Sequence, residues 1–351
     1  MTLEILVLLL VAATLVIAGT SLYSVRRLKG RISEIEDAPA VAGSIGYSVP
    51  LQKVAMVVNP SKLGASDAIL AVKAACAGVG FSEPLILETT VEDPGHAMTV
   101  EALEKGCTLV IAAGGDGTVR EVAEVLAGTG ATMALLPLGT GNLLARNLDF
   151  NVEDMDNALR VALHGRSRSI DAVRIVLERT DGSTGENVFL VMAGIGFDAD
   201  MMSDTNDDLK AKVGPLAYAE AGMRHLPGRR RNVTISIDDG PEQTRKIRSV
   251  IVANCGKLQG GLDLVPDAVV DDGKLDLVVM SPRSVVGWVW IAAKTALRHR
   301  RGIPVIDYYQ ARKVRISAAD PISSQLDGDT TGDVTALTVE VLPKALSIRV
   351  P

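Results

Sequence analysis

The sequence is poor in the residues that mark several common classes of protein. It has only three cysteines in 351 residues, at positions 76, 107 and 255, and their odd number and wide spacing do not form a disulfide framework. We therefore expect a reducing compartment. The four histidines show no metal-ligand spacing, which argues against a zinc enzyme. Because the formal net charge is −6, we also expect no nucleic-acid partner.

Hydrophobic residues, by contrast, are abundant, and one run of them lies near the start of the chain. Residues 5–23 carry no charge, which is enough for a helix to span a bilayer, and basic residues follow at 26–31. A secretory signal peptide would carry its positive charge before the apolar core, so the order here favours an uncleaved anchor. By the positive-inside rule, we expect a single-pass protein of the cytoplasmic membrane whose other domains lie in the cytosol.

The pattern of the remaining chain predicts two domains. Residues 1–30 would form the anchor with its basic flank, and residues 31–52 a linker without periodicity. Within residues 53–165, short apolar strands alternate with helical patterns, which predicts a Rossmann-like α/β domain with a parallel sheet. Strand-like segments dominate residues 166–351, which predicts a mostly antiparallel β-sandwich domain.

The most informative motif is GGDGT at residues 114–118. An apolar run precedes it and a helical pattern starts at Val119, so the motif is a glycine turn between a strand and a helix N-terminus. Glycines let a phosphate approach the backbone, and the helix N-terminus favours its negative charge. The carboxylate of Asp116 suits such a loop only if a cation mediates, which indicates Mg-nucleotide chemistry. The alternative is a tight turn with an Asp near the helix start.

Two further loops follow other strands of the predicted sheet. The loop after the first strand is Asn-Pro-Ser-Lys at 59–62, and the loop after the fourth strand is Gly-Thr-Gly-Asn at 139–142. They offer amide and hydroxyl groups and one cation suited to phosphate, and each is a weak signal alone. Since ligands bind at the carboxyl ends of strands in such sheets, the three loops together predict a nucleotide phosphate site.

Two acidic segments lie in the second half of the chain. Asp-Gly-Asp at 327–329 can supply a general base and a metal partner, or form a plain hairpin turn. Val-Val-Asp-Asp-Gly-Lys at 269–274 can hold a hard cation through carboxylates and backbone carbonyls, or form an acidic hairpin turn. The residues alone leave both choices open.

Together these motifs resemble the diacylglycerol kinase catalytic domain, a lipid kinase family that includes sphingosine and ceramide kinases. The likeness covers residues 53–351 and is greatest to the bacterial soluble-type diacylglycerol kinases. It rests on the order of the three loops, AGIGFDA at 193–199, PDAxxDDG at 266–273 and the late DGD. The resemblance implies an α/β domain like those of phosphofructokinase and NAD kinase, ATP and Mg²⁺ as cofactors, and phosphorylation of a membrane lipid hydroxyl. Diacylglycerol, which would give phosphatidic acid, is the expected acceptor.

The resemblance also implies roles for single residues. Asp116 would organise the catalytic Mg²⁺, Asp329 would accept the proton of the lipid hydroxyl, and Asp327 would support the metal or the base. A structural Mg²⁺ would be held by backbone carbonyls of Val269 and Lys274 and by the side chain of Asp272. The residues implied in ATP contact are Asn59, Pro60, Ser61, Lys62, Thr90, Gly115, Asp116, Gly117, Thr118, Val119, Arg120, Glu121 and Thr140.

Two positions depart from the family pattern. The late acidic motif usually ends in Glu, and Asp329 is one methylene shorter, so the base stays open between Asp327 and Asp329. Arg120 stands where the family often has Asn, and it adds a positive charge near the phosphates. The expected partners are the bilayer and its lipid substrate, and a homodimer is an option that the sequence leaves open.

Three other functions remain as alternatives. A sphingoid or other lipid kinase would differ in its acceptor, which the generic apolar residues of the second domain do not define. An NAD kinase-like enzyme would share the GGDGT loop but needs no membrane. An inactive lipid-binding protein would fit Asp329 in place of Glu, although the intact glycine loop argues against it.

Overall fold

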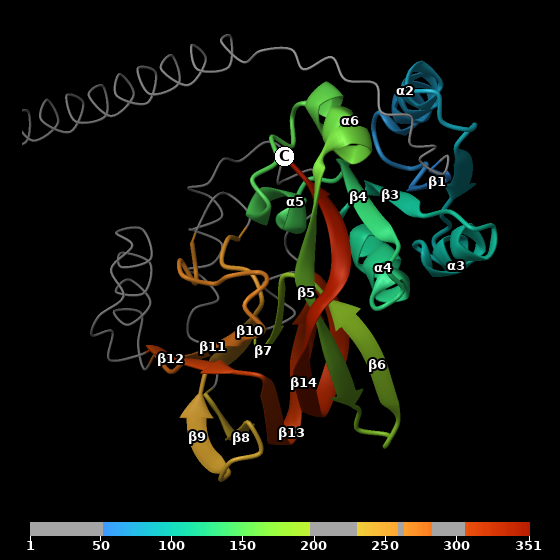
Figure 1. Ribbon diagram of the computed structural model, residues 1–351. Coiled ribbons are helices and arrows are strands. Elements are labelled where there is room, and N and C mark those ends of the chain that lie inside the picture. The colour runs from blue at the N-terminus through green and yellow to red at the C-terminus, as the bar shows by residue number, and fades with distance from the viewer. Residues whose placement is uncertain (1–51, 197–229, 259–262, 283–305) are drawn as a thin grey trace, which may run out of the picture. The chain divides into compact units, whose positions relative to one another are not determined.

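The computed structural model describes residues 52–196, 230–258, 263–282 and 306–351 (Figure 1). No helix within these ranges is both long and apolar enough to cross a bilayer. The predicted fold with a transmembrane helix, and the single-pass location in the cytoplasmic membrane, are therefore wrong for the described chain. The segment 5–23, on which both predictions rested, lies outside the described residues.

The first described part is the predicted alternation of strands and helices. Its elements are β1 (Val54–Val58), α2 (Ala65–Gly78), β2 (Leu85–Glu88), α3 (His96–Glu104), β3 (Leu109–Gly114), α4 (Asp116–Leu126), β4 (Thr132–Pro137), α5 (Leu143–Asn147) and α6 (Met155–His164). The strands are parallel in the order β4-β3-β1-β2. Every residue of β1 and β3 is buried, as expected for parallel strands covered on both faces. Their carboxyl ends therefore share one edge.

The second part is built from antiparallel strands. Its elements are β5 (Arg166–Glu178), β6 (Thr184–Phe189), β7 (Met192–Ile195), β8 (Arg231–Ile237), β9 (Gln243–Ile247), β10 (Ser249–Ala253), β11 (Leu275–Met280), β12 (Ile306–Ala311), β13 (Lys313–Leu326) and β14 (Asp329–Val350). A separate apolar core, which includes Phe189, Ile175 and Leu277, lies among these strands. The alternation of buried and exposed residues along β14 is what a strand with one covered face requires.

One sheet runs through both parts. Its strand order is β12-β11-β10-β7-β13-β14-β4-β3-β1-β2, and β14 pairs with β4 in parallel at Ser347 and Ile348. The long strands β5 and β14 lie side by side in antiparallel register (Figure 1). This pairing returns the C-terminal end of the chain to the end of α6, where the Arg349 guanidinium donates to the Gly165 carbonyl. The boundary predicted at residues 165 and 166 stays a prediction.

Two strand pairings bring sequence motifs together. The AGIG part of the glycine-rich segment forms most of β7, which pairs with the end of β13, with Ala193 opposite Leu326. The turn between β13 and β14 contains Asp327 and Gly328. The hairpin therefore carries the late acids at the end of β13 that lies beside β7.

Candidate functional site

The glycine loop between β3 and α4 meets the loop after β4 backbone to backbone. A Cβ atom at Gly139 would lie 2.6 Å from the Cα atom of Gly115, and a Cβ atom at Gly114 would lie 2.7 Å from the Thr118 side chain. Real side chains do not pack at such distances, so glycine is required at both positions. The Thr118 side chain is buried against Gly114, and residues 115–117 between them are half-buried.

Asp116 ties these two loops to each other. Its Oδ1 atom accepts a hydrogen bond of 2.6 Å from the Leu143 backbone N–H, and its Oδ2 atom lies against Gly141, where a Cβ atom has no room. Burial, together with the neighbouring carboxylates of Asp327 and Asp329, raises the pKa of Asp116 to about 6, against the hydrogen bond from Leu143. The site therefore places a partly desolvated carboxylate where a cation would stabilise its charge.

The loop after β1 approaches the same glycine turn. Asn59 donates its backbone N–H to the Ala113 carbonyl at the end of β3, and its side-chain oxygen accepts from the N–H and the hydroxyl of Ser61. This Asx turn directs Lys62 toward the glycine loop, with its Cε atom 3.9 Å from the position of a Cβ atom at Gly115. The lysine is therefore placed for a phosphate that rests on the glycines.

The remaining ATP-contact candidates differ in their exposure and in their distance from the glycine loop. Pro60, Ser61 and Thr140 are exposed on the loops just described, whereas Val119 and Glu121 are half-buried on α4. Thr90 is exposed after β2, which is separated from β3 by β1. Its hydroxyl accepts from the Asp93 N–H, so it belongs to the turn that precedes α3. The structure therefore brings three loops together and leaves Thr90 one strand further away.

Asp327 is a buried residue held by the backbone that leads into β7. Its carboxylate accepts hydrogen bonds of 2.9–3.1 Å from the N–H groups of Leu190, Val191 and Met192. Burial raises the pKa of the Asp327 carboxyl, although the three N–H groups favour the charged form. Since both carboxylate oxygens bind backbone, Asp327 fixes the turn at the end of β13.

Asp329 differs from its neighbour because its side chain is 54% exposed and lies against α4. Its Oδ2 atom accepts a 3.0 Å hydrogen bond from Nη1 of Arg120, and the same atom lies 3.4 Å from the position of a Cβ atom at Gly117. The hairpin of the second part therefore places a carboxylate beside the first turn of α4. The roles predicted for Asp116 and Asp329 stay predictions.

The segment 269–274 is fixed by different partners. The Asp272 Oδ1 atom accepts from the Lys274 N–H, and the Gly273 N–H donates to Asp171 at 2.7 Å. Asp171 is fully buried and also accepts from the Lys344 N–H in β14. The donor set of one carboxylate and backbone oxygens suits a hard cation. Within the described residues there is no cluster of three or more His, Cys, Asp or Glu side chains, so a cation here would depend on carbonyls.

Sequence reasoning missed Asp171 and Arg146 as supports of these loops. Asp171 is a lone carboxylate in the apolar run of β5, which was the available signal for a buried acceptor. The Arg146 side chain donates to the Gly141 carbonyl through Nε and steadies the loop after β4. Nothing in the local pattern distinguishes this arginine from a solvated one.

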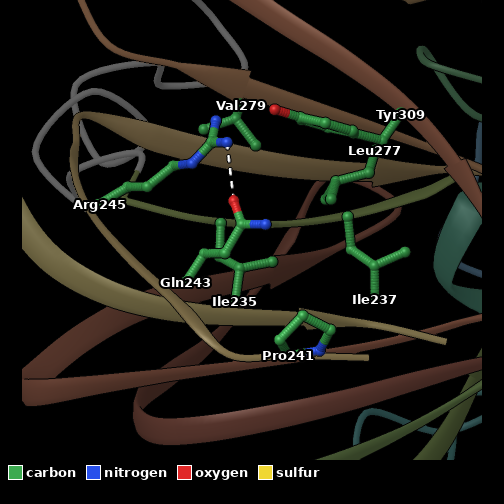
Figure 2. A pocket seen from close by; sticks show the side chains of 8 residues that line it. All are labelled: Ile235, Ile237, Pro241, Gln243, Arg245, Leu277, Val279 and Tyr309. Atoms are coloured by element: carbon green, nitrogen blue, oxygen red, sulfur yellow. Dashed lines mark hydrogen bonds between the residues drawn. The ribbon is translucent and has the colours of Figure 1, made fainter. Parts of the chain in front are cut away.

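An apolar pocket of about 100 Å³ lies elsewhere, among β8, β9, β11 and β12 (Figure 2). Its lining residues are Ile235, Ile237, Pro241, Gln243, Arg245, Leu277, Val279 and Tyr309. Arg245 donates a hydrogen bond to Gln243, and its guanidinium lies over the Tyr309 ring at 5.5 Å from the ring centre. The pocket is smaller than the roughly 300 Å³ of typical ligand sites, and none of the predicted site residues lines it.

Two family models match the chain. The one described as diacylglycerol kinase catalytic domain matches residues 53–175, and the one described as YegS C-terminal NAD kinase beta sandwich-like domain matches residues 191–350. The first match covers the α/β part and most of β5, and the second begins just before β7 and covers the rest of the antiparallel part.

Curated relatives agree with the family models. The chain is 29% identical to "Diacylglycerol kinase" of Bacillus subtilis (strain 168), over 72% of this chain and 81% of that protein. It is 32% identical to "Probable lipid kinase YegS-like" of Pseudomonas aeruginosa (strain UCBPP-PA14), over 85% of this chain and 94% of that protein.

Solved structures show the same fold. A diacylglycerol kinase of Bacillus anthracis str. Sterne matches with a TM-score of 0.67 at 22% identity, covering 87% of this chain and 99% of that one. Yeast NADH kinase matches with a TM-score of 0.51 at 13% identity, covering 86% of this chain and 83% of that one. These likenesses confirm the predicted combination of an α/β domain and a β-sandwich, without the transmembrane helix.

Proposed function

Because this chain belongs to the lipid kinase family that carries the diacylglycerol kinase catalytic domain, it is an ATP-using kinase, and we propose that its acceptor is diacylglycerol. The product would be phosphatidic acid. The observation that carries the proposal is the contact of the Asp329 hairpin with α4, which places an exposed carboxylate beside a glycine phosphate loop.

The glycine edge supports binding of ATP. The close approach of Gly115 and Gly139 leaves backbone without side chains at the end of β3, and α4 starts there with its N–H groups unpaired by the helix. Lys62 adds a positive charge at the same place. These groups would hold and orient the phosphates, which is the main requirement of phosphoryl transfer.

The acids at this edge support a role for Mg²⁺. Asp116 carries a pKa raised by burial and by two other carboxylates, and a divalent cation would relieve both the desolvation and the repulsion. When bound, Mg²⁺ would neutralise the charge that develops on the phosphates. We assign Asp116 to this cation, and the oxygens of Val269, Asp272 and Lys274 to a structural cation that would stabilise the loop before β11.

Asp329 is the better candidate for the general base. The Asp327 carboxylate is occupied by three backbone N–H groups inside the protein, whereas Asp329 is exposed beside α4. As the lipid hydroxyl oxygen attacks the γ-phosphorus, its proton would pass to Asp329. The bond from phosphorus to the bridging oxygen would break, and the electron pair would leave with ADP.

The acceptor is tested by a panel of candidate substrates with ATP labelled at the γ-phosphate and Mg²⁺. The panel would contain diacylglycerol, monoacylglycerol, sphingosine, ceramide, undecaprenol and NAD. We expect the label to enter the organic phase as phosphatidic acid when diacylglycerol is present, and to be lost in Asp116→Asn. Label on NAD in the aqueous phase, or on another lipid in preference to diacylglycerol, would refute the proposed acceptor.

A further inference from the structure

Two residues of the candidate site that lie far apart in the sequence contact each other. Arg120 and Asp329 are 209 residues apart in the chain, and Nη1 of the arginine lies 3.0 Å from Oδ2 of the aspartate. The same Nη1 atom donates to the Leu326 carbonyl at 3.2 Å, just before the turn that carries Asp329. One guanidinium therefore holds both sides of this turn.

The surroundings of Arg120 make this pair different from an exposed ion pair. Only 13% of the Arg120 side chain is exposed, whereas exposed pairs have mobile side chains and contribute little. Besides Asp329 and Leu326, the guanidinium lies 3.9 Å from the Glu121 carboxylate. A largely buried arginine with these neighbours has few other positions available, so its partner is restrained as well.

Helix geometry explains why the arginine can reach the turn. Asp116 and Arg120 are four residues apart on α4, so they share one face of the helix, and Gly117 beside them leaves room for the carboxylate. Among the described residues, Asp329 meets Arg120 through Oδ2. The Oδ1 atom is the oxygen left to face a substrate.

We propose that Arg120 is a positioning residue for the acid at Asp329. The proposal rests on the proposed function and deepens it: Arg120 holds Oδ2 against α4 so that Oδ1 points to the acceptor hydroxyl. Because the Asp329 side chain is 54% exposed, it would turn freely in solvent without this partner. Correct placement matters because an error of about 1 Å in a reacting group can cost 10²-fold in rate.

The test is a double-mutant cycle with Arg120→Asn, Asp329→Glu and the two combined. We measure kcat for the lipid acceptor and KM for ATP in the full-length chain. Each single substitution should lower kcat about tenfold or more while KM for ATP changes less than about twofold. The double variant should lose no more rate than the worse single variant, because both substitutions disrupt the same contact. Arg120→Lys, which keeps the charge but loses the planar fork, should fall between the wild type and Arg120→Asn.

Two outcomes would overturn the proposal. If the effects of the single substitutions simply multiply, the two residues do not act as a unit. If Arg120→Asn raises KM for ATP and leaves kcat unchanged, the arginine binds the ATP phosphates instead of positioning Asp329. Thermal unfolding of each variant shows whether it is folded. If Arg120→Asn folds poorly, Arg120→Lys and Asp329→Glu test the proposal by the same kcat and KM criteria.

A matched control comes from another arginine–acid pair. Arg174 and Glu340 are bonded across β5 and β14, away from the loops of the site, and Arg174→Asn should leave kcat and KM unchanged. Failure of the proposed function would show differently. In that case the wild type itself would transfer no phosphate to diacylglycerol, whereas failure of this proposal leaves wild-type transfer intact.

Discussion

Two Asp-Gly turns in this protein use their acids in different ways. In the turn at 327–329, one carboxylate is buried under three backbone N–H groups and the other is exposed against α4. In the turn at 271–273, Asp272 accepts from the N–H of Lys274 in its own loop, and Asp271 pairs with Arg168 at 2.9 Å. The comparison teaches that such a turn supplies a reactive acid only where a carboxylate is directed to another element that carries chemistry.

The largest effect should follow removal of the exposed acid in the first turn. Asp329→Asn keeps the shape but cannot take the proton, so kcat for diacylglycerol should fall about 10²–10⁴-fold. The matching change in the second turn, Asp272→Asn, should alter kcat less than about threefold at saturating Mg²⁺ because it touches no reacting atom. Steady-state kinetics of both variants measure these losses of kcat. Equal losses would show that the two turns do not differ in their role in catalysis.

The next effect concerns stability. Asp327→Ala leaves the N–H groups of Leu190, Val191 and Met192 without their acceptor, so the free energy of unfolding should drop by about 3 kcal/mol. Asp272→Ala removes an exposed contact within one loop and should cost only about 0.5 kcal/mol in the absence of Mg²⁺. Urea denaturation measures both. A loss for Asp327→Ala as small as that for Asp272→Ala would show that the buried carboxylate does not hold β7.

A pH dependence is expected where the carboxylates of the first turn lie near Asp116 of the glycine loop. The pKa of Asp116 is raised from 3.8 to about 6 by burial and by the carboxylates of Asp327 and Asp329. Between these pH values the folded protein keeps a proton that the unfolded chain has released, so this contribution to stability is lost as the pH rises through 6. The unfolding free energy of the wild type should therefore fall relative to that of Asp116→Asn as the pH rises from about 4 to 6 in Mg²⁺-free buffer. A difference between the two proteins that stays constant with pH would contradict the raised pKa of Asp116.

The smallest effect should appear at the second turn. If the oxygens of Val269, Asp272 and Lys274 hold a cation, Mg²⁺ should raise the unfolding temperature of the wild type by a few degrees more than that of Asp272→Asn. Thermal scans with Mg²⁺ and with a chelator give the comparison. An equal rise in both proteins would assign the Mg²⁺ effect to another site.

Local patterns predicted much of the first part of the chain. The apolar runs at β1 and β3 and the helical spacing after the glycines led to the observed strands and to α4, and the shared sheet edge followed from parallel topology. These features depend on neighbours in the sequence. The same reasoning failed for the transmembrane helix, since composition alone does not place a segment in a membrane.

The rest depends on contacts between distant residues. Asp327 binds N–H groups about 135 residues earlier in the chain, and Arg120 meets Asp329 across 209 residues. The pairing of β14 with β4, which joins the two parts of the sheet, is equally long-range. No local periodicity encodes such pairings, so the reason to propose Asp329 rather than Asp327 as the base came only from the structure.

The most direct test of the account is product analysis by mass spectrometry after incubation with diacylglycerol, ATP and Mg²⁺. Wild type, Asp329→Asn and Arg174→Asn would be compared at equal concentrations. We predict phosphatidic acid from the wild type and from Arg174→Asn, and at most a few per cent of that amount from Asp329→Asn in the initial-rate period. Equal phosphatidic acid from all three proteins, or none from the wild type, would contradict the assignment of this site.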